Sequence, residues 1–357
     1  STLQQTASSL LHISPKDTMK ICQKLYEGGF ITYMRTDSKT LSKEFLEKIE
    51  QLIKQKYGET YVRENLLELS ERAQEKLKKG KKTKKKKEEE EKESTAQEAH
   101  EAIRPTDILR EHIPDTMEPR EKKMYHLIWR TTMESCMATA QYLSLSASIT
   151  AHEGYQYRYS TEKVVFPGWK AVAGYDEDNP IYEHLLSLKK KVVVEYKKVE
   201  SKVSMKELKS HYTEAKLISL LEQRGIGRPS TFSALLDKIQ ERGYVKKENV
   251  QGKKISCTDF ILEEDAIEET ISQREFGNEK GKLVVQPTGY LVVEFLIKHF
   301  PDLFDYGYTK QMEDRLDKIA KAEEIWHNLC RDCYEDIQLA SRDLVSNKVT
   351  IPIDEYH

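Results

Sequence analysis

Apolar residues recur at every third or fourth position in several stretches of the chain, which is the spacing of one buried helix face. The first stretch covers residues 14–28, where Ser14 is placed to cap a helix, Pro15 falls in its first turn and a glycine pair follows. Two more cover about 42–57 and a segment that begins at 118. Residues 30–34, after the glycine pair, are predicted to be extended.

The pattern changes to alternation over residues 141–172, which are rich in β-forming side chains, as is the valine triplet 192–194. The sequence therefore predicts a β-rich domain of roughly 80 residues between two helical parts.

Helical spacing returns at Thr213, the expected cap of a helix that ends at Gly225. Ser230 or Thr231 is the expected cap of the next helix. With two extended segments between 244 and 256, these helices predict a helix-turn-helix followed by a wing.

The last hundred residues are predicted to be mostly helical, with Thr309 capping one helix and a final helix near 322–344. We therefore expect a multidomain protein of mixed α and β structure. Its parts are a helical 1–112, a β-rich 113–204 and a mostly helical 205–357.

Charged residues are numerous but balanced, since 58 Lys and Arg face 60 Asp and Glu for a formal net charge of −2. This balance excludes a protein that binds nucleic acid by bulk positive charge, and no apolar run approaches the roughly 18 residues that span a membrane. The distribution is uneven, because residues 209–254 hold ten basic against five acidic side chains, a net of +5, whereas 259–275 hold seven acidic against one basic. The basic stretch could dock a polyanion, although ordinary charged helix surfaces explain it equally well.

Residues 73–97 hold a block of lysines followed by a block of glutamates. Such a segment cannot pack, so it is predicted to be a mobile charged insertion; a basic arm that reaches DNA is the alternative to a solvated loop. The five cysteines indicate reduced thiols. Cys330 and Cys333 form a C-x-x-C inside a predicted helix, and without a second ligand pair no metal site is predicted.

The segment around Tyr33 combines a nucleophile with a cation. In an extended segment side chains alternate, so Tyr33 and Arg35 would point to the same side with Cα atoms about 6–7 Å apart. A phosphate would fit between them, and the guanidinium would favour the phenolate that attacks. Thr36 and Ser38 add hydroxyl donors for a phosphate backbone. On spacing alone, simple stacking of the tyrosine and arginine is the more common arrangement.

A second cluster places His100 and Arg104 just before Pro105, where both could face a phosphate. It is not the zinc-protease pattern, because a second histidine is missing four residues after the first. A helix end with a hydrogen-bonded histidine is the alternative.

A third cluster, residues 224–231, has two glycines, the basic Arg228 and the hydroxyls of Ser230 and Thr231 where a helix begins. Close backbone approach and free N–H groups there would suit an anion. An ordinary turn between two helices explains the same residues.

In this order and wording the clusters resemble the type IA DNA topoisomerases. The motifs that carry the resemblance are LYEGGFITYMRTDS, HEAIRPTD, YHLIWRTTMESCM, FPGWKAV, RGIGRPSTF and YTKQMEDRLDKIA. The resemblance runs from Ser1 to about residue 320, and YMRTDS and HEAIRP are closer to the bacterial topoisomerase I and reverse gyrase branch than to topoisomerase III.

The resemblance implies a toroidal core, with a helical gate domain, a β-rich arch and a mostly helical, DNA-cradling base. It implies that Tyr33 attacks single-stranded DNA, forms a 5′-phosphotyrosine and leaves a 3′-hydroxyl, so that strand passage and resealing change DNA topology without ATP. Arg35 would hold the scissile phosphate. Together with the clusters above, the residues expected to bind DNA are Thr36, Ser38, His100, Arg104, Arg228, Ser230 and Thr231.

In the family, acidic residues of a toprim domain hold Mg²⁺, and no such domain is found before Ser1. The resemblance therefore implies Mg²⁺ held outside this chain, by a toprim-containing partner chain or a missing amino-terminal part. The expected location is the cytoplasm, or the nucleus in a eukaryote, in association with DNA. The alternative function is a catalytically silent single-stranded DNA-binding module of the same fold; the intact Tyr33, Arg35 and His100 favour the enzyme.

Overall fold

The computed structural model describes residues 1–70, 101–175 and 178–347, with side chains as far as Arg342. The charged insertion expected at 73–97 and the candidate residue His100 lie outside these ranges.

A helical unit opens the chain. It contains α1 (Thr2–Leu11), α2 (Pro15–Glu27), α3 (Lys43–Lys56) and α5 (Pro119–Cys136), with short 3-10 turns at Glu59–Tyr61 and Leu66–Leu69. The hydroxyl of Ser14 caps α2 by accepting a hydrogen bond from the Asp17 amide at 3.1 Å, as the sequence predicts. The apolar faces of the four helices meet in one core, where Leu25, Ile49 and Met124 are completely buried.

The strands of the described residues form three antiparallel sheets. The strands are β1 (Gln141–Thr150), β2 (Gln156–Phe166), β3 (Lys198–Ser201), β4 (Val245–Val250), β5 (Lys253–Glu263), β6 (Ala266–Phe276) and β7 (Glu279–Val285). β1 pairs with β2, β5 lies between β3 and β6, and β4 pairs with β7. The helix α6 (Pro180–Ser187) packs against β1 and β2, and a 3-10 turn spans Gly168–Val172.

A second helical part includes α7 (Glu214–Gln223) and α8 (Phe232–Glu241), which share a small core of Ile218, Phe232 and Leu236. It continues in α9 (Pro287–His299), α10 (Tyr306–Ala320) and α11 (Trp326–Asn347).

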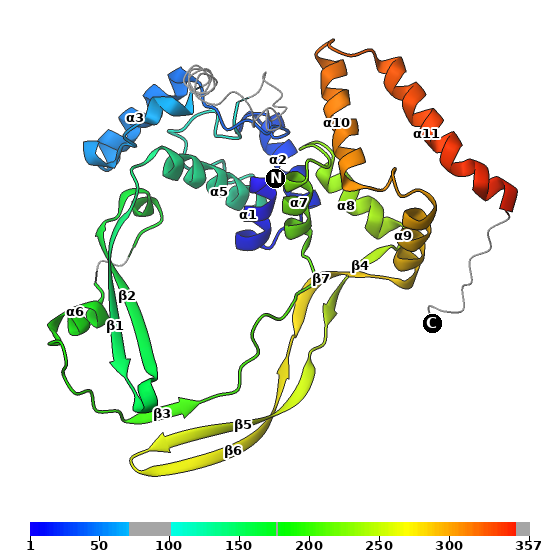
Figure 1. Cartoon of the computed structure of the whole chain (residues 1–357). Coiled ribbons are helices and arrows are strands. Elements are labelled where there is room, and N and C mark those ends of the chain that lie inside the picture. Colours follow the sequence, from blue (N-terminus) through cyan, green and yellow to red (C-terminus); the bar gives the residue numbers. More distant parts are fainter. Residues whose placement is uncertain (71–100, 176–177, 348–357) are drawn as a thin grey trace, which may run out of the picture.

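These parts follow one another around a ring (Figure 1). Going around the ring, the first helical unit is followed by the β1–β2 ribbon, by β3 with the β5–β6 hairpin, by the β4–β7 ribbon, and finally by α7 and α8. The ring closes where α1 packs beside α7 and α2 beside α8. An ion pair of 2.9 Å joins Lys16 Nζ on α2 to Asp237 Oδ2 on α8 at this closure. The expected toroid of mixed α and β structure is confirmed.

No helix within the described ranges is long and apolar enough to cross a lipid bilayer.

Some local predictions are wrong. Residues 30–34 form no strand, and Ile31 makes only an isolated bridge with Pro105. The valines 192–194 also lie outside any strand and are exposed. Residues 258–285 form strands, whereas helices were expected there. The sequence did not reveal these strands, because long ribbons exposed on both faces, such as β6, lack the clear apolar alternation of half-buried strands.

The wing and one helix start also differ from expectation. β4 pairs with β7, while residues 253–256 begin β5 and pair with β6. Thr309 lies inside α10, whose N-cap is Asp305; its carboxylate accepts from the Gly307 amide at 2.7 Å. Thr213 caps α7 as expected, because its side chain accepts a hydrogen bond from the Lys216 amide. Thr231 occupies the expected N-cap position of α8, but its side chain makes no cap hydrogen bond.

Candidate active site

Tyr33 lies on a loop, residues 32–40, whose two ends are tied to the same residue. Thr32 Oγ1 donates a hydrogen bond to the carbonyl oxygen of Ala102 at 2.8 Å, and the Ala102 amide donates to the Thr40 carbonyl at 2.8 Å. The Arg104 amide donates to Thr32 Oγ1 at 2.9 Å. The first two sequence clusters therefore meet in space, and we call residues 32–40 the Tyr33 loop.

Hydroxyl groups inside the Tyr33 loop shape its backbone. Thr36 Oγ1 accepts from the Ser38 amide at 3.0 Å, and Ser38 Oγ accepts from the Thr40 amide at 3.2 Å. Short side chains that bond the backbone two residues on are typical of tight turns. Thr36 is only 6% exposed, so its main role in this structure is to hold the loop. Phosphate contacts by Thr36 and Ser38 stay predictions.

Tyr33 and Arg35 flank a buried anchor. Met34 between them is 3% exposed and belongs to the core, whereas Tyr33 is half-buried and Arg35 exposed. The Tyr33 ring meets Tyr26 of α2 edge to face, with ring centroids 5.3 Å apart. Arg35 has no hydrogen bond or ion pair with any residue in the described ranges. Its guanidinium is therefore available to an anion.

Arg104, by contrast, is engaged within the protein. Its Nε donates to Glu101 Oε2 at 2.6 Å and its Nη1 to the Pro105 carbonyl at 2.9 Å. The guanidinium also stacks over the Phe45 ring at 4.1 Å from the centroid, and the side chain is 12% exposed. These contacts anchor the segment that holds the Tyr33 loop, and a DNA contact by Arg104 stays a prediction.

The third cluster forms the turn between α7 and α8. Ser230 and Thr231 are exposed at the start of α8, and Thr231 Oγ1 accepts from the Arg228 amide at 2.9 Å. The Arg228 side chain points to α10, where its Nη2 lies 2.6 Å from Asp317 Oδ2. The hydroxyls of this cluster are therefore more accessible than its guanidinium.

The start of α1 is attached to α7. The two helices pack together, and Ser1 Oγ donates a hydrogen bond to Glu222 Oε2 on α7. The first helical unit therefore lies beside the helix that leads into the third cluster, a relation that no sequence pattern predicts.

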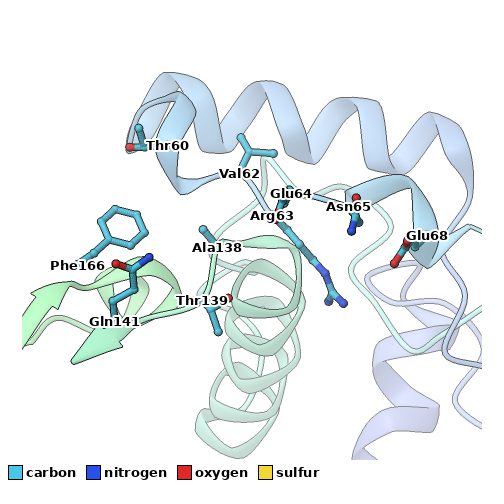
Figure 2. Close-up of a pocket in the computed structure, with 10 residues that line it drawn as sticks. All are labelled: Thr60, Val62, Arg63, Glu64, Asn65, Glu68, Ala138, Thr139, Gln141 and Phe166. Atoms are coloured by element: carbon cyan, nitrogen blue, oxygen red, sulfur yellow. The ribbon is translucent and has the colours of Figure 1, made fainter. Parts of the chain in front are cut away.

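A polar hollow of about 390 Å³ lies elsewhere, between the segment after α3 and the start of β1 (Figure 2). Its lining residues are Thr60, Val62, Arg63, Glu64, Asn65, Glu68, Ala138, Thr139, Gln141 and Phe166. The Arg63 guanidinium extends past α5 in Figure 2 and donates to the Ser135 carbonyl at 3.1 Å. No sequence-predicted site residue lines this hollow, and charges of both signs line it.

The sequence analysis missed the role of Thr32. The signal in the sequence was its place directly before Tyr33. A hydroxyl that faces inward needs a partner, and Ala102 and Arg104 supply it. Asp317, the partner of Arg228, was also missed, because 89 residues separate the two.

Comparison with known proteins supports the family resemblance of the sequence motifs. The family model described as DNA topoisomerase matches residues 1–260. DNA topoisomerase 1 of Helicobacter pylori is 33% identical over 363 residues, which are 98% of this chain and 42% of that protein. A mimivirus protein named DNA topoisomerase 1 type prokaryotic is 32% identical over 375 residues, 98% of this chain and 41% of that protein.

Full-length topoisomerase I from Thermotoga maritima matches in structure with a TM-score of 0.61 at 25% identity, over 95% of this chain and 48% of that chain. The chain thus spans less than half the length of these relatives. From its motifs, its ring of domains and these matches, it belongs to the type IA family of DNA topoisomerases.

Proposed function

We propose that this chain is the tyrosine-bearing part of a topoisomerase that cuts and reseals one strand of DNA. The observation that carries the proposal is the Tyr33 loop, which is fixed at both ends by Ala102. It holds a half-buried tyrosine and an exposed arginine that pairs with no residue in the described part of the chain. A loop held in this way presents its two functional side chains in one geometry, as catalysis by positioning requires.

In the proposed reaction Tyr33 Oη attacks the phosphorus of a single-stranded DNA backbone. The bond from phosphorus to the 3′-oxygen breaks as the bond to the tyrosine forms, and the phenol proton is transferred overall to the leaving 3′-oxygen, which becomes a 3′-hydroxyl. The product is a 5′-phosphotyrosine, so one phosphoester replaces another and the reverse attack reseals the strand without ATP. Arg35 holds the phosphate oxygens and stabilises the charge that develops on them.

Other parts of the ring contact the strand around the break. Ser230 and Thr231 offer exposed hydroxyls at the start of α8, and the N-terminus of a helix is a setting that suits a phosphate. His100, outside the described residues, is included because its motif leads directly into the segment that holds the Tyr33 loop. Single-stranded DNA is the proposed substrate of this surface.

Magnesium is assigned to the part of the enzyme that this chain does not include. Within the described ranges, no group of three or more His, Cys, Asp or Glu side chains is placed to hold a metal ion. These residues do not fit a resident Mg²⁺, so no step above goes through the ion.

The test combines this chain, the remaining part of a family member as a second polypeptide, and an oligonucleotide labelled at either end. We expect the 3′-labelled half to become bound to protein and the 5′-labelled half to be released with a free 3′-hydroxyl. Tyr33→Phe should abolish both products. Binding without any adduct would support the silent DNA-binding module, and an adduct carrying the 5′ label would contradict the proposed polarity.

A further inference from the structure

The Arg228 guanidinium lies next to acidic side chains of one helix, α10. Its Nη2 lies 2.6 Å from Asp317 Oδ2 and 3.7 Å from Asp314 Oδ1, and its Nη1 lies 3.9 Å from Glu313 Oε2. The side chain is 21% exposed. Three carboxylates of α10 therefore surround a guanidinium that the family resemblance assigns to DNA.

The same guanidinium closes its own turn. Nη1 donates to the carbonyl oxygens of Gly227 at 2.9 Å and Gly225 at 3.4 Å. Both glycines have positive φ, at 78° and 70°, so their carbonyls point away from the regular helix ladder and need other donors. An arginine poised for a phosphate would instead direct its paired N–H groups outward.

The turn between α7 and α8 contacts α10 along one face of that helix. The Arg224 guanidinium lies over the Tyr306 ring at 3.9 Å from the centroid. Lys310 packs so closely on Gly225 that a Cβ there would lie 3.0 Å from Lys310 Cγ. Tyr306, Lys310 and Asp317 fall within about 40° of one another around a helix of 3.6 residues per turn. All three contacts therefore come from one face of α10.

Arg228 also connects this face of α10 to the exposed hydroxyls. Its backbone amide donates to Thr231 Oγ1 at 2.9 Å, and Thr231 Oγ1 donates back to the Arg228 carbonyl at 3.2 Å. A shift of Arg228 would therefore move the Thr231 side chain and the start of α8.

We infer that Arg228 is a positioning residue: its ion pair with Asp317 fixes the turn on α10, so that Ser230 and Thr231, and not the Arg228 guanidinium, contact the DNA backbone. The DNA-binding half of this inference rests on the proposed function. The pair itself makes α10 a required support of the DNA-binding surface.

A positioning role and a phosphate-binding role of Arg228 predict opposite effects of Asp317→Asn on DNA binding. If the carboxylate supports the turn, Asp317→Asn weakens binding of a single-stranded oligonucleotide, as Arg228→Ala does. If it competes with phosphate for the guanidinium, Asp317→Asn tightens binding. Asp314→Asn is the matched control, because it makes the same charge change on the same helix at a longer distance from Arg228.

The experiment measures the Kd of the full chain for the oligonucleotide over a range of salt. We expect Arg228→Ala and Asp317→Asn each to raise Kd about three- to tenfold relative to the wild type and the Asp314→Asn control, with no further loss in the double variant. The slope of log Kd against log salt should stay unchanged. Loss of one phosphate contact would change this slope by about 0.7 for single-stranded DNA. A slope changed by that amount in Arg228→Ala but not in Asp317→Asn would overturn the inference. Tighter binding by Asp317→Asn would overturn it as well.

The exchanged pair Arg228→Asp with Asp317→Arg decides the case if a single variant unfolds. Restored affinity, within about twofold of the wild type, is expected for a positioning pair, whereas a phosphate-binding arginine moved to α10 would leave affinity low. Hydrogen exchange of amides 226–232 gives a readout independent of DNA. Faster exchange in both single variants and protection in the exchanged pair are expected; unchanged exchange in the single variants would refute the support role. If the wild type does not bind DNA, the proposed function fails while exchange still tests the pair.

Discussion

Thr32, the residue directly before Tyr33, donates a hydrogen bond from its Oγ1 to the carbonyl oxygen of Ala102 at 2.8 Å. The same Ala102 holds the far end of the Tyr33 loop through its amide and the Thr40 carbonyl. One residue of a distant segment thus sets where the loop begins and ends, and with it the position of the tyrosine.

Thr32→Val should slow formation of the covalent DNA adduct about 10- to 100-fold, because a displacement of the nucleophile by about 1 Å has effects of that size. Oligonucleotide affinity should hardly change. Thr32→Ser keeps the hydroxyl and should restore most of the rate. Thr106→Val is the control. It removes a similar hydrogen bond, from the Thr106 hydroxyl to the Gly29 carbonyl oxygen at 2.7 Å, which lies outside the Tyr33 loop. Equal slowing by both valine variants would show a general loss of structure.

Lys16→Glu should loosen the ring closure, because the ion pair with Asp237 is replaced by repulsion between α2 and α8. Energy transfer between dyes at Lys20 and Glu241 should fall, and Asp237→Lys in the same chain should restore it. The effect should shrink in high salt, since both partners are partly exposed. Lys43→Glu, which breaks an i,i+4 pair inside α3, is the control and should leave the transfer unchanged; a decrease there as well would remove the special role of Lys16.

Glu121→Gln should make stability less dependent on pH. A hydrogen bond from Lys24 at 2.9 Å, and a second from the Glu118 amide, lower the pKa of the Glu121 carboxyl. A lowered pKa stabilises the fold above the ordinary value of about 4.3, and this contribution is lost as pH falls through the folded-state pKa.

Urea unfolding at about pH 6 and pH 3 checks this prediction. The variant should be about 1–2 kcal/mol less stable at the higher pH and should lose less stability on acidification than the wild type. Glu47→Gln, on an exposed pair of α3, should titrate like the wild type. Parallel pH curves for wild type and Glu121→Gln would contradict the prediction.

The cysteines should differ sharply in reactivity. Burial raises the pKa of the Cys22 thiol to about 12 and that of Cys136 to about 11, so neither forms the reactive thiolate near neutral pH. Cys330 is exposed and Cys333 partly so. Alkylation followed by mass spectrometry should modify Cys330 first and Cys22 and Cys136 only after unfolding. Rapid modification of Cys22 in the native protein would contradict the core described for α2.

Much of the helical architecture could be predicted because local signals and packing agree. The Ser14 cap, the apolar stripe of α3 and the caps Thr213 and Thr231 all lie where helical spacing places them. Strands 258–285 could not be predicted in this way, since exposed ribbons carry polar residues on both faces.

The sequence motifs propose residues for the candidate site but do not show how these residues are connected. The motif around Tyr33 pointed to a nucleophile and a cation, while the link through Ala102 depends on a pairing across about 70 residues that only the fold establishes. Arg104 and Arg228 illustrate the same limit. A basic residue in a motif does not show which carboxylate, Glu101 or Asp317, stands beside it.

The identity of the residue that becomes linked to DNA tests the central claim most directly. This chain and the remaining part of a family member are reacted with an oligonucleotide and then digested. Mass spectrometry should find the phosphodiester on Tyr33 in the wild type and also in Tyr26→Phe, which alters the ring that neighbours Tyr33. Tyr33→Phe should give no adduct. An adduct on Tyr26 or any other residue, or one that persists in Tyr33→Phe, would contradict the account.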